Sequence, residues 1–132
     1  MPMRIYLLLP LLIPAICNAA DLEYKCTVKG EISLQDDGNL KPHARPIEIG
    51  KQFVVDRVSG KVVSAPLRNL TAAEIRVLNR GSKDHTFELL SVSSPTGKAT
   101  TDLLVIHEFV KNKNKPFVAV TSVGEVYSGI CE

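Results

Sequence analysis

Three histidines are the side chains of this 132-residue sequence best suited to acid–base or metal chemistry. His43, His85 and His107 lie far apart, so none forms the i, i+4 pair of a helical metal site or the i, i+2 pair of a strand site. A zinc centre would have to be assembled from distant segments. The sequence therefore predicts no metal site and no cofactor.

Serine and carboxylate residues carry no recognisable catalytic motif. Ser128 stands in Tyr-Ser-Gly, and the Gly-x-Ser-x-Gly elbow of many hydrolases does not occur. Residues 36–39, Asp-Asp-Gly-Asn, offer oxygen atoms as calcium loops do, but they lack the alternate spacing and the distant glutamate of such a loop. The same residues are common turn formers, so we expect a β-turn. We expect a non-catalytic protein, and a small hydrolase remains the least favoured alternative.

Charged residues in two loops are the candidate partner-binding groups. The alternating lysines of Lys-Asn-Lys-Asn-Lys, before Pro116, could dock an anionic surface, although solubilising charges at a hairpin tip look the same. A long loop expected over residues 36–46 supplies the others. The candidate set is Lys111, Lys113, Lys115, Asp36, Asp37, His43 and Arg45.

The N-terminus has the layout of a secretory signal peptide. An apolar run over residues 5–17 follows Arg4, and the small residues Ala19 and Ala20 come next. The run is too short for a membrane-spanning helix. We expect residues 1–20 to be removed, with cleavage after Ala19 or Ala20, leaving no transmembrane segment. Lipid attachment at Cys17 is a minor alternative, because Ile16 is bulkier than processing before a lipidated cysteine usually allows.

Cleavage leaves two cysteines, Cys26 and Cys131, near the two ends of the mature chain. Two cysteines in an exported protein predict a disulfide, and no second ligand stands near either at metal-site spacing. We therefore expect a Cys26–Cys131 bridge and a periplasmic or secreted protein.

Composition excludes several classes of function. Sixteen Lys and Arg residues against 14 Asp and Glu give a net charge of +2, too small for a dedicated nucleic-acid binder. Tryptophan is missing and aromatic residues are only 5% of the chain, which argues against a base-stacking platform. The length fits one domain, over residues 21–132, and we expect a monomer.

Short β-prone runs separated by turn residues predict an all-β domain. Turns are expected at Lys29-Gly30, Ser59-Gly60 and Val123-Gly124, and loops this short join antiparallel neighbours. The expected strands cover residues 22–28, 31–34, 52–57, 61–64, 74–79, 86–91, 102–109, 117–122 and 126–131. The sequence therefore predicts an antiparallel meander.

Side-chain alternation makes this prediction sharper. Tyr24, Cys26 and Val28 share one face of the first strand, while Tyr127 and Cys131 share one face of the last, together with the glycine between them. Since a disulfide requires close Cα atoms, the first strand should lie next to, or across from, the last. The chain should then form a small closed or nearly closed barrel, or a sandwich, stapled by the disulfide.

Two segments leave alternatives open. Residues 71–80 carry a helix capping pattern, but Ile75 and Val77 favour a strand. Leu103 to Ile106 form an apolar run on both faces, which indicates either a strand covered on both sides or one that faces an unseen partner.

A binding or interaction module is the function that these features favour. The strings over residues 53–61 and 115–131 resemble small exported bacterial proteins, which implies a role in the bacterial envelope or outside the cell. The partner is expected to be an envelope or extracellular component, and the lysine cluster favours an anionic one. A barrel that carries a small apolar ligand among its aromatic side chains is the alternative.

Overall fold

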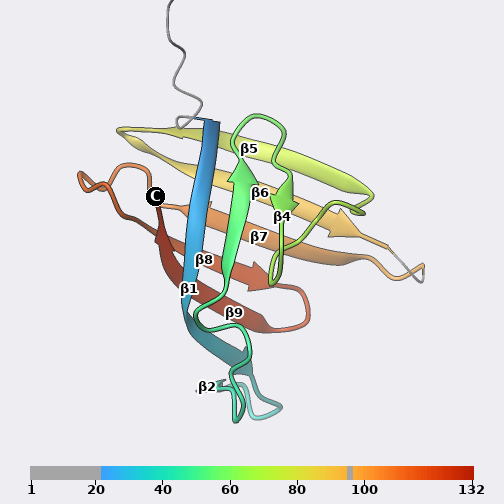
Figure 1. Cartoon of the computed structure of the whole chain (residues 1–132). Coiled ribbons are helices and arrows are strands. Elements are labelled where there is room, and N and C mark those ends of the chain that lie inside the picture. Colours follow the sequence, from blue (N-terminus) through green and yellow to red (C-terminus); the bar gives the residue numbers. More distant parts are fainter. Residues whose placement is uncertain (1–21, 95–96) are drawn as a thin grey trace, which may run out of the picture.

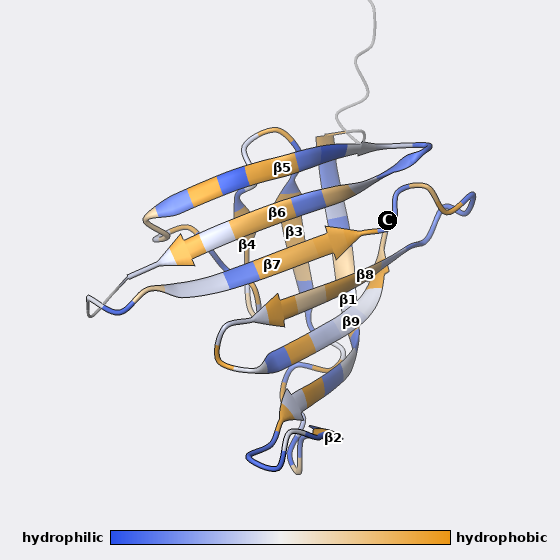
Figure 2. Ribbon diagram, turned by 180° about the vertical axis from the view of Figure 1, so that it is seen from behind, coloured by the Kyte–Doolittle hydropathy of each residue, from blue (hydrophilic) through white to orange (hydrophobic). Residues whose placement is uncertain are grey.

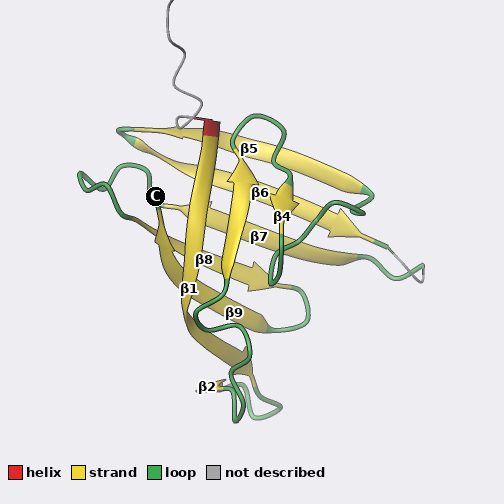
Figure 3. Cartoon of the chain, viewed as in Figure 1, coloured by secondary structure: helices red, strands yellow, loops and turns green. Residues whose placement is uncertain are grey.

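The computed structural model describes residues 22–94 and 97–132, which form strands and connecting loops apart from a helical turn marked at Leu22 alone (Figure 3). The predicted signal peptide lies outside these residues. Strand-rich segments match the runs of β-branched and aromatic residues. The strands are β1 (Glu23–Leu34), β2 (Leu40–Pro42), β3 (Gln52–Asp56), β4 (Val62–Val63), β5 (Glu74–Ser82), β6 (His85–Ser93), β7 (Thr100–Ile106), β8 (Lys115–Thr121) and β9 (Glu125–Cys131).

The nine strands of the described residues belong to one antiparallel sheet that curls into a half-barrel. The order is β4-β3-β1-β9-β8-β7-β6-β5, and β2 pairs with the far part of β1. In Figure 1, β1, β3 and β4 run steeply in front of β5 to β8, so the two halves of the sheet face each other. The all-β prediction is confirmed, with an open rather than a closed barrel.

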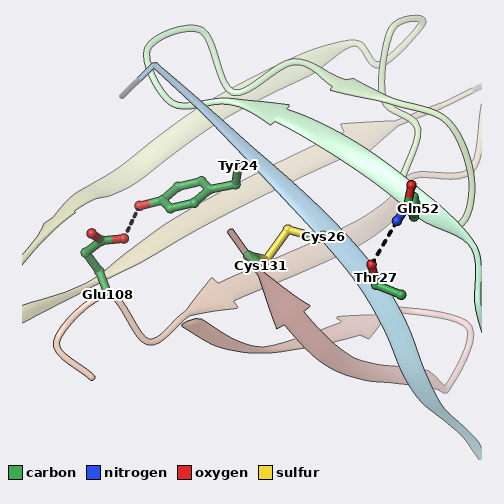
Figure 4. Close-up of a disulfide and its surroundings, with 6 residues drawn as sticks. All are labelled: Tyr24, Cys26, Thr27, Gln52, Glu108 and Cys131. Atoms are coloured by element: carbon green, nitrogen blue, oxygen red, sulfur yellow. Dashed lines mark hydrogen bonds between the residues drawn. A yellow bond between two sulfur atoms is a disulfide. The ribbon is translucent and has the colours of Figure 1, made fainter. Parts of the chain in front are cut away.

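A disulfide joins the first and last strands, as predicted (Figure 4). Cys26 and Cys131 are directly opposite each other in the β1–β9 ladder. The neighbouring pair, Lys25 and Glu132, exchanges both backbone hydrogen bonds, at 3.0 and 2.9 Å. The cysteines therefore occupy a non-hydrogen-bonded pair, in which side chains come closest. We call this part of the half-barrel the stapled end.

The prediction of a turn at Lys29-Gly30 is wrong. Strand β1 continues through these residues, and its pairing with β9 shifts between Val28 and Gly30, which marks a β-bulge. A bulge inserts one residue and changes which side chains face inward. As a result Glu31 pairs with Tyr127 on the inner face of the sheet, although simple alternation from Val28 would place it outside.

Residues 74–82 form strand β5, so the strand alternative for the segment 71–80 is confirmed from residue 74 onward. The preceding connection closes part of the gap between the edge strands β4 and β5. Its buried Asn69 accepts a hydrogen bond from the Val62 amide at 2.6 Å and donates to Gly60 O and Ser91 Oγ at 2.8 and 2.9 Å. One amide side chain thus ties β4 to β6 across the opening.

Aromatic side chains fill the stapled end. Phe53 packs edge-to-face on Phe117, with ring centroids 5.3 Å apart, and Tyr24 packs similarly on Phe87 at 5.2 Å. The Tyr24 hydroxyl donates to Glu108 Oε2 at 2.6 Å (Figure 4). Burial, and then this hydrogen bond, raise the pKa of Tyr24. These contacts occupy the space between the strands and favour a packed core over a ligand-carrying barrel.

The outer face of the sheet carries an apolar row that the core does not use. Side chains directly opposite one another in successive ladders lie on the same face. Such pairings join, from β6 to β1, Leu90, Leu103, Val120, Val126 and Ile32.

Strand β7 contributes to both faces of the sheet. Its hydrophobic run is continuous in Figure 2. Leu104 and Ile106 are buried in the core, whereas Leu103 is 36% exposed on the outside. The core therefore covers the inner side of β7 and leaves its outer side exposed, so the alternative of a strand covered on both sides is not observed.

Candidate functional site

Two hairpins meet at the end of the half-barrel opposite the disulfide, which we call the hairpin end. The β1–β2 turn is closed by the Gln35 amide donating to Asn39 O at 2.8 Å, so the turn predicted for residues 36–39 is confirmed. The β8–β9 turn is closed by the Gly124 amide and Thr121 O at 3.0 Å. The Leu34 amide then donates to Gly124 O at 2.8 Å and holds the two hairpins together.

A groove of about 620 Å³ lies on the outer face between these hairpins. Its apolar walls come from both hairpins, and Asp36 is the charged residue that lines it. The groove continues the apolar row through Val120 and Val126. Its apolar lining residues are Leu34, Leu40, Val120, Val123 and Val126.

The apolar side chains that line the groove are unusually exposed to solvent. Leu34 is 56% and Val123 is 70% exposed. Contiguous exposed apolar surface on a small domain marks interaction sites more often than scattered single residues do. Chemically, the groove suits an apolar segment rather than a reactive substrate.

Polar side chains converge on the inner face of the same end. Glu31 on β1, His43 just after β2 and Glu125 at the start of β9 place one ligand atom each within 4.8 Å of one another. His43 Nε2 is 2.8 Å from Glu125 Oε2. The β1–β9 register explains the pairing of carboxylates, because Glu31 opposite Tyr127 is the diagonal neighbour of Glu125.

Negative charge dominates this inner-face cluster. Glu31 is only 5% exposed, and its Oε2 accepts a hydrogen bond from the Glu48 amide at 2.9 Å. Glu48 itself forms an ion pair with Lys51 at 3.1 Å. Burial, and then the charges of Glu125, Glu31 and Glu48, raise the pKa of Tyr127 to about 12. The site is therefore electrostatically suited to a cation.

Asp102 adds another carboxylate to the inner face. It pairs with Thr121 on β8 and Ser91 on β6, and it stands two residues before the buried Leu104, so both side chains lie on the same face of β7. Burial raises the pKa of Asp102. Its ionised form is therefore less stable here than in water.

The lysine cluster expected to dock an anionic partner is divided by the fold. Lys115 Nζ donates to Glu108 O at 3.1 Å and to Val110 O, so its ammonium holds the β7–β8 loop together. Among the residues that the structure describes, Lys113 makes only a long ion pair, with Glu132 at 3.8 Å. Lys111 and Lys115 line a second, smaller pocket of about 340 Å³. The docking role of these residues stays a prediction.

The structure also places the other predicted partner-binding residues in different surroundings. Asp36 lines the groove, while the Asp37 carboxylate folds back on its own turn and accepts from the Asn39 amide at 2.9 Å. That hydrogen bond lowers the pKa of Asp37. Arg45 is exposed in the β2–β3 connection. His43 is brought to the inner-face cluster, far from the lysines in sequence.

Sequence reasoning missed Glu31 and Glu125 as partners of His43. The three residues come from separate segments, and the β-bulge reverses the face that alternation assigns to Glu31. A glycine inside a strand pattern is a signal for a bulge, so Gly30 was the available clue.

Comparisons with known proteins identify no relative. The chain matches no protein-family model, and no curated protein and no solved structure gives a significant match. Within residues 22–94 and 97–132, no helix has the length and apolar character needed to cross a membrane.

Proposed function

We propose that this protein is an exported, non-catalytic binding module that holds an apolar segment of a partner protein in the outer-face groove. The observation that carries the proposal is the open apolar groove between the two hairpins, continuous with the row on the outer face. Binding residues commonly lie on loops positioned by a rigid scaffold. The disulfide supports an oxidising compartment, periplasmic or extracellular.

Charge favours a partner segment with a basic side chain. Asp36 lines the groove and makes no ion pair among the described residues, whereas neighbouring Asp37 is paired with Lys41 at 3.4 Å. A lysine or arginine next to the apolar residues of the partner would meet this free carboxylate. The groove therefore differs from the lysine cluster, which would select an anion.

Selection from a random peptide library against the untagged, disulfide-bonded mature protein tests the proposal. We expect enriched peptides to combine apolar residues with Lys or Arg, and ¹⁵N-detected NMR shifts to map to the groove. Val123→Asp should reduce binding at least tenfold. Val58→Asp is the matched control, because Val58 is 59% exposed in the β3–β4 connection.

Three results would overturn the proposal. The first is a library with no enrichment, and the second is equal binding by the Val123→Asp and wild-type proteins. The third is concentration-dependent dimerisation, measured by sedimentation, that Val123→Asp abolishes. In that case the occupant is a second copy of this chain rather than a partner.

A further inference from the structure

Glu31, His43 and Glu125 form a ligand set that is independent of the groove. Ile32 points to the outer face, whereas Glu31, one residue earlier, lies on the inner face. The sheet therefore separates the cluster from the groove. Whatever binds one does not occupy the other.

We propose that Glu31, His43 and Glu125 bind a single divalent transition-metal ion, with Zn²⁺ as the best match to the donor set. One imidazole nitrogen and two carboxylates are typical ligands for zinc. Calcium and magnesium prefer oxygen ligands alone, so the histidine argues against them. The two carboxylates also neutralise the charge of the ion.

The burial of Glu31 is the second observation that points to a cation. Glu31 as a whole is 5% exposed, and within the described part of the chain its Oε2 accepts one hydrogen bond, from the Glu48 amide. Among the described residues, no Lys or Arg forms an ion pair with it. A buried carboxylate is unfavourable without a compensating charge, and a bound cation supplies that charge. The surrounding acids make the potential at the site still more negative.

The geometry needs only a small closure. Ligands on one zinc ion lie roughly 3–4 Å apart, given metal–ligand distances of about 2 Å, while the three ligand atoms here lie within 4.8 Å. The side chains of His43 and Glu125 are 36% and 24% exposed, so both can rotate toward the fixed Glu31. Three protein ligands would leave a coordination position for water or another group.

Isothermal titration of ZnCl₂ into the untagged, EDTA-treated mature protein tests the site. We expect one ion per chain. Glu31→Gln, His43→Gln and Glu125→Gln should each weaken binding at least tenfold. His85→Gln is the matched control and should leave binding unchanged, because His85 is an exposed histidine that also stands beside an acid, Asp84, but lies outside the cluster.

Nitrogen NMR of histidine-labelled protein gives a readout that misfolding would not imitate. Zn²⁺ should shift the imidazole signals of His43 and leave those of His85 and His107 in place. His43→Gln changes a residue next to an exposed strand, so a folded variant is expected even if Glu31→Gln unfolds. Binding that survives His43→Gln, shifts at the other histidines, or no binding would each overturn the proposal.

Discussion

The two ends of the half-barrel use the same curved sheet for different purposes. At the stapled end, inward side chains are aromatic or sulfur-bearing and pack on one another, as Phe53 does on Phe117. At the hairpin end, inward side chains include Glu31 and Glu125, and the outer face is apolar and exposed. The stapled end thus holds groups that stabilise the fold, whereas the hairpin end holds groups that cost stability and that we propose bind partners.

The largest expected effect is at the stapled end. Replacing both cysteines, as Cys26→Ala with Cys131→Ala, removes a cross-link between residues separated by 105 positions. The chain-entropy model gives a loss of about 4–5 kcal/mol for such a loop. Urea unfolding of both proteins under non-reducing conditions measures it. A loss below about 1 kcal/mol would contradict the view that this end is the main source of stability.

Gly129→Ala should be the next most damaging change. A Cβ atom at this position would lie 2.0 Å from Thr27 O and 2.7 Å from Phe117 Cε1, and backbone cannot move aside as a flexible side chain does. We expect a loss of about 3 kcal/mol in the free energy of unfolding. The exposed neighbour Ser128→Ala is the control and should change stability by no more than about 0.5 kcal/mol. Similar effects from both variants would contradict the close packing of β9 on β1.

Lys113, in the β7–β8 loop, and Lys115, at the start of β8, allow a sharper comparison within the stapled end. Lys115→Met removes the ammonium that binds the Glu108 and Val110 carbonyls, and we expect a loss of about 1–2 kcal/mol. Lys113→Met removes only a long, exposed pair, so the change should be close to zero. Thermal unfolding distinguishes them. Equal losses of stability for the two variants would contradict a structural role for the Lys115 ammonium.

The smallest expected effect is a gain in stability rather than a loss, and it concerns Asp102 on the inner face, toward the hairpin end. Burial raises the pKa of Asp102 above its ordinary value of 3.8, so its stabilising contribution is present below pH 3.8 and is lost as pH rises through the folded-state value. Asp102→Asn should therefore stabilise the protein at pH 7, by less than about 1 kcal/mol because of solvent screening. The gain should vanish below pH 3.8. Urea unfolding at both values checks this, and destabilisation at pH 7 would contradict the comparison.

Much of the fold was predictable because local signals agreed with one another. The turn residues marked most strand ends, and alternation placed Cys26 and Cys131 on faces that meet. The candidate site was less predictable. Of the residues in the groove and the inner-face cluster, the sequence predicted only His43 and Asp36 as site residues. The three lysines expected to act together are not equivalent, because the ammonium of Lys115 binds a backbone carbonyl.

The sequence by itself determined the strand periodicity, the pairing of Cys26 with Cys131 and hence the adjacency of the first and last strands. Local patterning and covalent chemistry are enough for these. Tertiary structure alone decided that β1 continues through Gly30 with a bulge, which turns Glu31 inward to meet His43 and Glu125. The reason is that one inserted residue reverses the two-residue period of a strand, and the register that absorbs it depends on the neighbouring strand.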